Sequence, residues 1–118
     1  YARLHEVAAV ALAAGQRVIV DAAFLRRGER DDFRRLAQTC GVPFMVLHCR
    51  APEALLRERV QARGERADDA SEADLAVLDR QLAGAEPLAA EEQGTAITVD
   101  TGAPVEIEAL AARWLAAR

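Results

Sequence analysis

The sequence predicts an α/β fold with three layers, α/β/α, in which a parallel sheet lies between helices. Short apolar runs at residues 18–20, 43–49 and 96–99 are typical of buried strands. Segments with apolar residues at helical spacing separate these runs, and strands that alternate with helices form parallel sheets through right-handed crossovers. Hydrophobic residues make up 52% of the chain but aromatic residues only 4%, which favours closely packed, alanine-rich helices.

The first half of the chain contains two predicted helices. Apolar residues recur on one helical face over residues 1–14, and Gly15 ends that helix. The run at residues 18–20 follows, and we expect it to be a strand covered on both faces. A second helix ends at Gly41, before the strand at residues 43–49. Its apolar face consists of Phe33, Leu36, Ala37 and Cys40.

Three further helices are expected in the second half. One begins at Pro52 and fades near Gly64, where residues 64–70 are polar and predict a loop. The next opens with Ser71 and Asp74, which resemble a capping box, and ends at Gly84. After a loop and the strand at residues 96–99, a final helix closes the chain. Its apolar face consists of Ile107, Leu110, Ala111, Trp114 and Leu115.

Composition excludes several classes of partner. The 15 basic and 19 acidic residues are mixed along the chain and give a net charge of −4, so no basic stripe predicts nucleic-acid binding. No apolar run reaches the roughly 18 residues of a membrane span. Cys40 and Cys49 form neither a zinc motif nor a disulfide framework, so we expect two small buried thiols in a reduced, cytoplasmic protein. Tyr1 lies within a helical pattern, so we expect the chain to be part of a longer protein.

Polar residues follow each predicted strand. Asp21 follows the first, Arg50 the second, and Asp100 with Thr101 the third. Ligands bind beyond the carboxyl ends of the strands in open parallel sheets, so the functional site is expected at this edge.

Asp21 has two interpretations that the residues alone leave open. An ionised carboxylate at the end of a buried run needs a cation, a metal ion or hydrogen-bond donors. It either organises Mg²⁺ beside the phosphates of a nucleotide, as a Walker B aspartate does, or caps the following turn or helix.

Several arginines also have two interpretations. Arg59 and Arg63 are four residues apart, so they project from one side of a helix and could clamp phosphate oxygens or stack on a base. The alternative is a solvated helix face, as the i, i+4 pair of Glu53 and Arg57 is expected to be.

The arginine pair after the first strand could bind an anionic acceptor. Arg26 and Arg27 could equally pair with acidic residues at the start of the next helix, and we expect at least one of them to do so. Those acidic residues are Glu29, Asp31 and Asp32.

The two histidines have structural interpretations. His5 is expected at the surface or in helix packing, and His48 as a core histidine with its hydrogen bonds satisfied.

Four stretches, in this order and spacing, resemble the later two thirds of P-loop small-molecule kinases. That group includes adenylate, gluconate and chloramphenicol kinases and zeta-toxin-like, AAA-type ATP-binding proteins. "RVIVDAAFLRR" resembles their strand, aspartate and following arginine, and "PFMVLHCRAPEALLRERVQARG" the next strand and the helix into the lid. "DDASEADLAVLDRQLAGAEP" is similar to the lid-exit segment, and "AITVDTGAP" to the last strand and the loop at the nucleotide base.

The resemblance implies a P-loop NTPase-like domain over residues 1–118, with a lid-like segment at about 64–84, that uses ATP and Mg²⁺. It implies that Asp21 organises the metal and that Arg59 and Arg63 contact adenine and the transferring phosphates. Thr101 and Gly102 would lie near the base, and Arg26 or Arg27 on the acceptor side.

The chain departs from the family pattern in two ways. It contains no lysine and no G-x-x-x-x-G-K-[ST] motif, so the P-loop and its strand are missing. In the family, that strand lies between the strands matching residues 18–20 and 44–49, so an upstream segment or a second copy of the chain would complete the sheet. Leu25 also stands where nucleotide kinases have arginine.

The resemblance predicts that the complete protein transfers the γ-phosphoryl group of ATP to a hydroxyl of an unidentified small molecule, while the chain alone is inactive. The alternative is a non-catalytic α/β regulatory or interaction module on the same scaffold. A phosphatase-type domain with Asp21 as nucleophile is disfavoured, because no second aspartate follows at D-x-D spacing.

Overall fold

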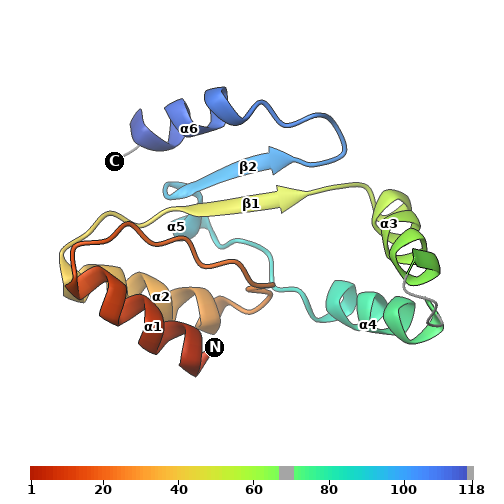
Figure 1. The fold of residues 1–118 in the computed structure, drawn as a ribbon, viewed down its shortest axis with the longest axis horizontal. Coiled ribbons are helices and arrows are strands. Elements are labelled where there is room, and N and C mark those ends of the chain that lie inside the picture. Colours follow the sequence, from red (N-terminus) through yellow and green to blue (C-terminus); the bar gives the residue numbers. More distant parts are fainter. Residues whose placement is uncertain (67–70, 117–118) are drawn as a thin grey trace.

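The structure is a computed structural model that describes residues 1–66 and 71–116 and has an α/β fold (Figure 1). The elements in chain order are α1 (Ala2–Ala13), α2 (Arg27–Cys40), β1 (Val46–Arg50), α3 (Glu53–Arg66), α4 (Ser71–Gly84), α5 (Ala90–Gln93), β2 (Ala96–Asp100) and α6 (Ile107–Ala116). The five predicted helices are therefore present, and the short helix α5 was not predicted.

The sheet pairs β1 with β2 in parallel, as predicted. The register runs from Val46 beside Ala96 to Arg50 beside Asp100, so both strands end at the same level. The residues that follow the two strands therefore meet at one edge of the sheet.

The predicted strand at residues 18–20 is wrong. In the described part of the chain, this segment belongs to no helix or strand and pairs with neither β1 nor β2. Val18 and Val20 pack against the core formed by α1 and α2, whereas Ile19 is 80% exposed. The sequence predicts cover on both faces of this apolar run, but only one face is covered. A strand also needs a neighbour for its backbone groups, and the described residues supply none.

Helices α1 and α2 form the main apolar core. Ala8 of α1 is buried against Phe33 and Leu36 of α2. The ring of His5 lies edge-on to Phe33 at a centroid distance of 5.4 Å, so the prediction that His5 takes part in helix packing is confirmed. Gly41 ends α2 in the left-handed conformation, with a φ of 67° that glycine adopts without strain.

The boundaries of α3 and β1 differ from the prediction. Helix α3 continues to Arg66, so residues 64–66 are helical rather than part of a loop, while residues 67–70 lie outside the described part. The predicted cap by the Ser71 side chain also lies outside it. Strand β1 begins at Val46, three residues after Pro43.

The two cysteines are exposed, so the prediction that they are buried is wrong. Cys40 is the last residue of α2, where the helix leaves the core. Cys49 lies on the same face of β1 as Leu47, which is 43% exposed. The sequence indicated a fully buried strand, but the described helices leave this part of β1 open to solvent.

Candidate functional site

The turn after β2 is tied to the end of β1. The backbone N–H of Thr101 donates to the carbonyl oxygen of Arg50 over 2.7 Å, and the Thr101 hydroxyl donates to the same oxygen over 3.0 Å. The N–H of Gly102 donates to Oδ1 of Asp100 over 2.8 Å. These bonds fix the turn at the edge of the sheet where the sequence predicted a ligand site.

Arg59 reaches this turn from α3. Its Nη1 donates to the hydroxyl oxygen of Thr101 over 3.3 Å, and its Nη2 donates to the carbonyl oxygen of Thr101. Two residues predicted to bind nucleotide, 42 positions apart in the chain, are thus in direct contact.

Gly102 is needed here because its surroundings are crowded. A Cβ atom at this position would lie 3.0 Å from Oδ1 of Asp100 and 3.2 Å from Cδ of Pro52. A larger residue would therefore displace the turn that contacts Arg59.

The structure does not bring Arg63 or Asp21 into this contact. Both side chains are exposed, and neither makes a hydrogen bond or ion pair within residues 1–66 and 71–116. Asp21 also does not cap the next helix: the N-cap of α2 is Arg26. The exposed Asp21 carboxylate is therefore available to a ligand.

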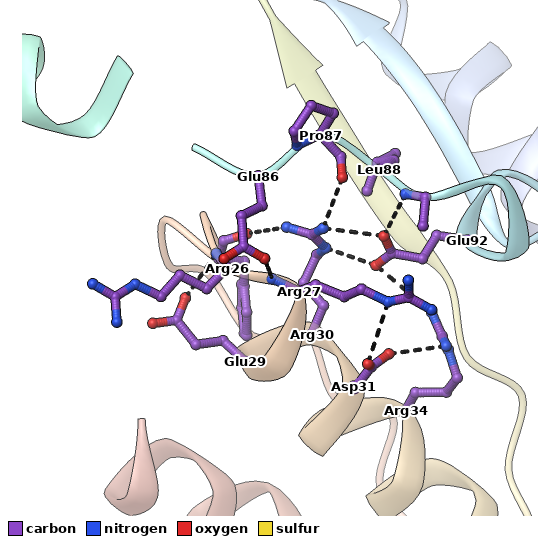
Figure 2. Close-up of polar contacts among 12 residues, drawn as sticks. Arg26, Arg27, Glu29, Arg30, Asp31, Arg34, Glu86, Pro87, Leu88 and Glu92 are labelled. Carbon is purple, nitrogen blue, oxygen red and sulfur yellow. Dashed lines mark hydrogen bonds and ion pairs between the residues drawn. The ribbon is translucent and has the colours of Figure 1, made fainter. Parts of the chain in front are cut away.

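The two arginines at the start of α2 differ. Arg27 lies 3.6 Å from Asp31 and 3.5 Å from Glu91, and its backbone N–H donates to Glu86 over 2.9 Å. The prediction that at least one arginine pairs with neighbouring acidic residues is confirmed for Arg27. Figure 2 shows the Arg26 side chain extending away from the Arg30–Glu92 pair, on the side of Glu29.

Sequence reasoning missed a buried ion pair between Arg30 and Glu92 (Figure 2). Arg30 Nε donates to Glu92 Oε1 over 2.7 Å, and Arg30 Nη2 donates to Glu92 Oε2 over 3.0 Å. Glu92 also accepts the backbone N–H of Ala89 over 2.7 Å. Mainly because of the hydrogen bonds from Arg30, the pKa of Glu92 falls to about 2, and Glu92 in turn raises the pKa of Arg30.

Arg30 also holds the segment that carries Asp21. Its Nη1 donates to the carbonyl oxygen of Phe24 over 2.9 Å, and Phe24 N–H donates to the Tyr1 hydroxyl, also over 2.9 Å. Phe24 has a φ of 47°, a conformation that is uncommon for a bulky residue and needs such support. The ion pair therefore positions the chain between Asp21 and α2.

The sequence also predicted an ion pair between Glu53 and Arg57 and a core position for His48. The i, i+4 pair is confirmed, because Arg57 binds Glu53 over 3.0 Å, and it also binds Asp79, which joins α3 to α4. His48 is half-buried, and burial followed by the charges of Arg50 and Arg30 lowers its pKa. No hydrogen bond to its ring is found in the described part, so the expected satisfied core histidine is not observed.

The residues present fit a magnesium ion held mainly by water and phosphate. Within residues 1–66 and 71–116, no cluster of three or more His, Cys, Asp or Glu side chains could hold a metal ion by itself. Mg²⁺ typically keeps several waters and binds one or two carboxylates plus substrate phosphates. A single exposed carboxylate at Asp21 matches that requirement.

None of the helices within residues 1–66 and 71–116 has the length and the hydrophobicity that a membrane span requires.

Ligands of open parallel sheets bind beyond the carboxyl ends of the strands, which is the edge where Arg59 contacts the turn after β2. A family model described as an AAA domain matches residues 1–88, which is more than half of the chain. The chain belongs to this family, a kinase-like group of P-loop AAA domains, and the predicted resemblance is confirmed. No curated protein and no solved structure matches the chain.

Proposed function

We propose that the complete protein containing this chain is a cytoplasmic, ATP-dependent kinase that transfers the γ-phosphoryl group to a hydroxyl of a small molecule. The contact between Arg59 and Thr101 carries this proposal. This contact places a cation beside a turn with polar backbone groups at the carboxyl edge of a parallel sheet. Nucleotides bind at this edge in such folds. Family membership supports the nucleotide part of the proposal.

The proposed roles follow from charge and position. Asp21 would help to hold Mg²⁺, which neutralises charge on the phosphates. Arg59 would contact the nucleotide beside Thr101 and Gly102. Arg63 lies one helical turn further along α3, with an exposed guanidinium, and would bind the transferring phosphates when the lid-like segment, about residues 64–84, closes.

Arg26 is the better candidate for binding the acceptor. The Arg27 guanidinium already lies close to two carboxylates, those of Asp31 and Glu91. No ion pair involves the Arg26 guanidinium in the described part of the chain, and it extends away from Arg30 and Glu92 (Figure 2). An acceptor with a negative charge would thus bind to Arg26 rather than to Arg27.

Phosphoryl transfer also needs a phosphate-binding loop. Since the 118 residues contain neither a lysine nor the loop motif, an upstream segment or a second copy of the chain would supply it. The loop's strand would complete a three-layer domain beside β1. In support, Ile19 is exposed, residues 18–20 pair with no described strand, and the described residues form no ladder on the second edge of β1.

The absence of lysine and of the loop motif also favours a second candidate. In that case the chain keeps the scaffold as a non-catalytic regulatory or interaction module and does not turn over nucleotide. Magnesium-dependent ATP binding tests the nucleotide site, and turnover of the bound ATP by the complete protein separates the two candidates.

The test is isothermal titration calorimetry of the complete protein with ATP, with and without Mg²⁺. The kinase proposal predicts that Mg²⁺ strengthens binding and that Asp21→Asn removes most of this gain. Asp32→Asn is the matched control, because Asp32 is an exposed carboxylate in an i, i+3 pair with Arg35. An ATP affinity that changes neither with Mg²⁺ nor in Asp21→Asn would contradict the role of Asp21. The absence of any ATP binding would favour the regulatory module.

A further inference from the structure

A hollow of about 340 Å³ lies between the start of α2 and the second half of α4. We call it the α2–α4 pocket. Its polar side chains include Arg26, Glu29, Arg80 and Gln81, and its apolar wall includes Leu25 and Val77. The volume is at the lower end of the range of small-molecule sites, roughly 300–1,000 Å³, and the hollow is open to solvent.

The helix itself leaves the charge of Arg80 uncompensated. The positions three and four residues away on α4 are Ala76, Val77, Ala83 and Gly84, none of which carries a charge. Its acidic neighbour Asp79 binds Arg57 of α3 instead. Among the described residues, no hydrogen bond or ion pair involves the Arg80 side chain.

Arg26 approaches the same pocket from the other side. The Glu29 carboxylate accepts the backbone N–H of Arg26 over 3.2 Å, so it is engaged at the end of the helix. Two arginines and one glutamate thus line the pocket, on a chain whose net charge is −4. The local excess of positive charge, next to apolar side chains, suits a compact organic anion.

We propose that the α2–α4 pocket binds the carboxylate or phosphate group of a small organic molecule through Arg26 and Arg80, with its apolar part against Leu25 and Val77. The identity of this molecule as the phosphoryl acceptor rests on the proposed function. The anion site itself rests only on the pocket and its charges. Arginine is well suited to this task, because its planar group donates two parallel hydrogen bonds to an oxyanion.

The test is a titration of the ¹⁵N-labelled complete protein with phenyl phosphate, benzoate and phenol, followed by NMR without ATP or Mg²⁺. We expect phenyl phosphate or benzoate, or both, to shift the amide signals of Leu25, Arg26 and Gln81, and phenol to bind at least about fivefold more weakly. Whichever anion binds more tightly identifies the group that the pocket prefers.

Variants of the two arginines test whether the pocket recognises the negative charge of the ligand. Arg26→Ala and Arg80→Ala are each expected to weaken anion binding by about three- to tenfold, and Arg80→Lys to retain part of it. Arg113→Ala on α6, another exposed arginine, should have no effect. Because Arg26 and Arg80 lie on different elements, a loss in both variants does not come from misfolding of one helix.

Three results would overturn the proposed anion site. Phenol could bind as tightly as the anions, the signal shifts could be confined to other regions, or the affinity could be unchanged in both alanine variants. Since the titration contains no nucleotide, its outcome is independent of the ATP experiment. Anion binding without ATP binding would keep the pocket and remove the kinase proposal.

Discussion

Arg30 and Glu92 form a two-pronged ion pair in which the residues are 4% and 0% exposed. The pair joins α2 to α5 across 62 positions of the chain. Through its bonds to the carbonyl oxygens of Phe24 and Pro87, Arg30 also connects the segment after Asp21 to the loop before α5. This arrangement makes the pair a structural link between α2, the segment after Asp21 and the loop before α5.

Replacing Glu92 by glutamine is expected to lower the free energy of unfolding by about 3 kcal/mol. The reason is that removal of one partner leaves the other charge buried without compensation. Urea unfolding followed by circular dichroism measures the change. The neighbouring Glu91→Gln is the matched control, because Glu91 is largely exposed and its pair with Arg27 should contribute less than about 1 kcal/mol. Equal losses in both variants would contradict the buried pair.

The same pair predicts a dependence of stability on pH. Hydrogen bonds from Arg30 lower the pKa of Glu92 from 4.5 to about 2 in the folded protein. A lowered pKa stabilises the fold above the unfolded value, and this contribution is lost as the pH falls from about 4.5 towards 2. We therefore expect the difference in unfolding free energy between the protein and Glu92→Gln to shrink over this range. A difference that stays constant down to pH 2 would be inconsistent with the lowered pKa.

The crowded turn at Gly102 makes a further prediction. Gly102→Ala should lower the unfolding free energy by about 1 kcal/mol or more, because the added methyl group must displace Asp100 or Pro52. Gly28→Ala is the contrasting variant: Gly28 is the second residue of α2 with open space around its Cα, and alanine has the higher helix propensity. Thermal unfolding of both variants checks the opposite signs, and a stabilised Gly102→Ala would show that the turn is not crowded.

Local patterns predicted most of the helices. Helix α2 illustrates this success: Phe33, Leu36 and Ala37 marked its buried face, and Gly41 marked its end. The parallel pairing of β1 and β2 also followed from the alternation of helices and strands. These features depend on residues that are close in sequence.

Features that depend on distant neighbours were less predictable. The apolar run at residues 18–20 indicated a strand, but strand formation also needs a partner with free backbone groups. Cys49 looked buried because it lies in an apolar run, yet no described element covers it. Local sequence does not reveal which faces a fold leaves open.

The site was predicted in part. The sequence grouped Arg59 and Thr101, which are in contact, but gave no sign that Glu92 lies against Arg30. One signal was available for Arg30: it stands three residues before Phe33 and seven before Ala37, on the buried face of α2. A charged residue on such a face needs a partner, so this position pointed to an ion pair that the sequence alone could not complete.

The most direct test of the account is the affinity of the complete protein for Mg·ATP when Arg59 is changed to alanine. Calorimetry should show a loss of about tenfold or more in Arg59→Ala, since charge-assisted hydrogen bonds to phosphate or base are removed. A smaller loss is expected in Arg63→Ala, and none in Arg113→Ala. An unchanged affinity in Arg59→Ala would contradict the claim that the contact between α3 and the turn after β2 marks a nucleotide site.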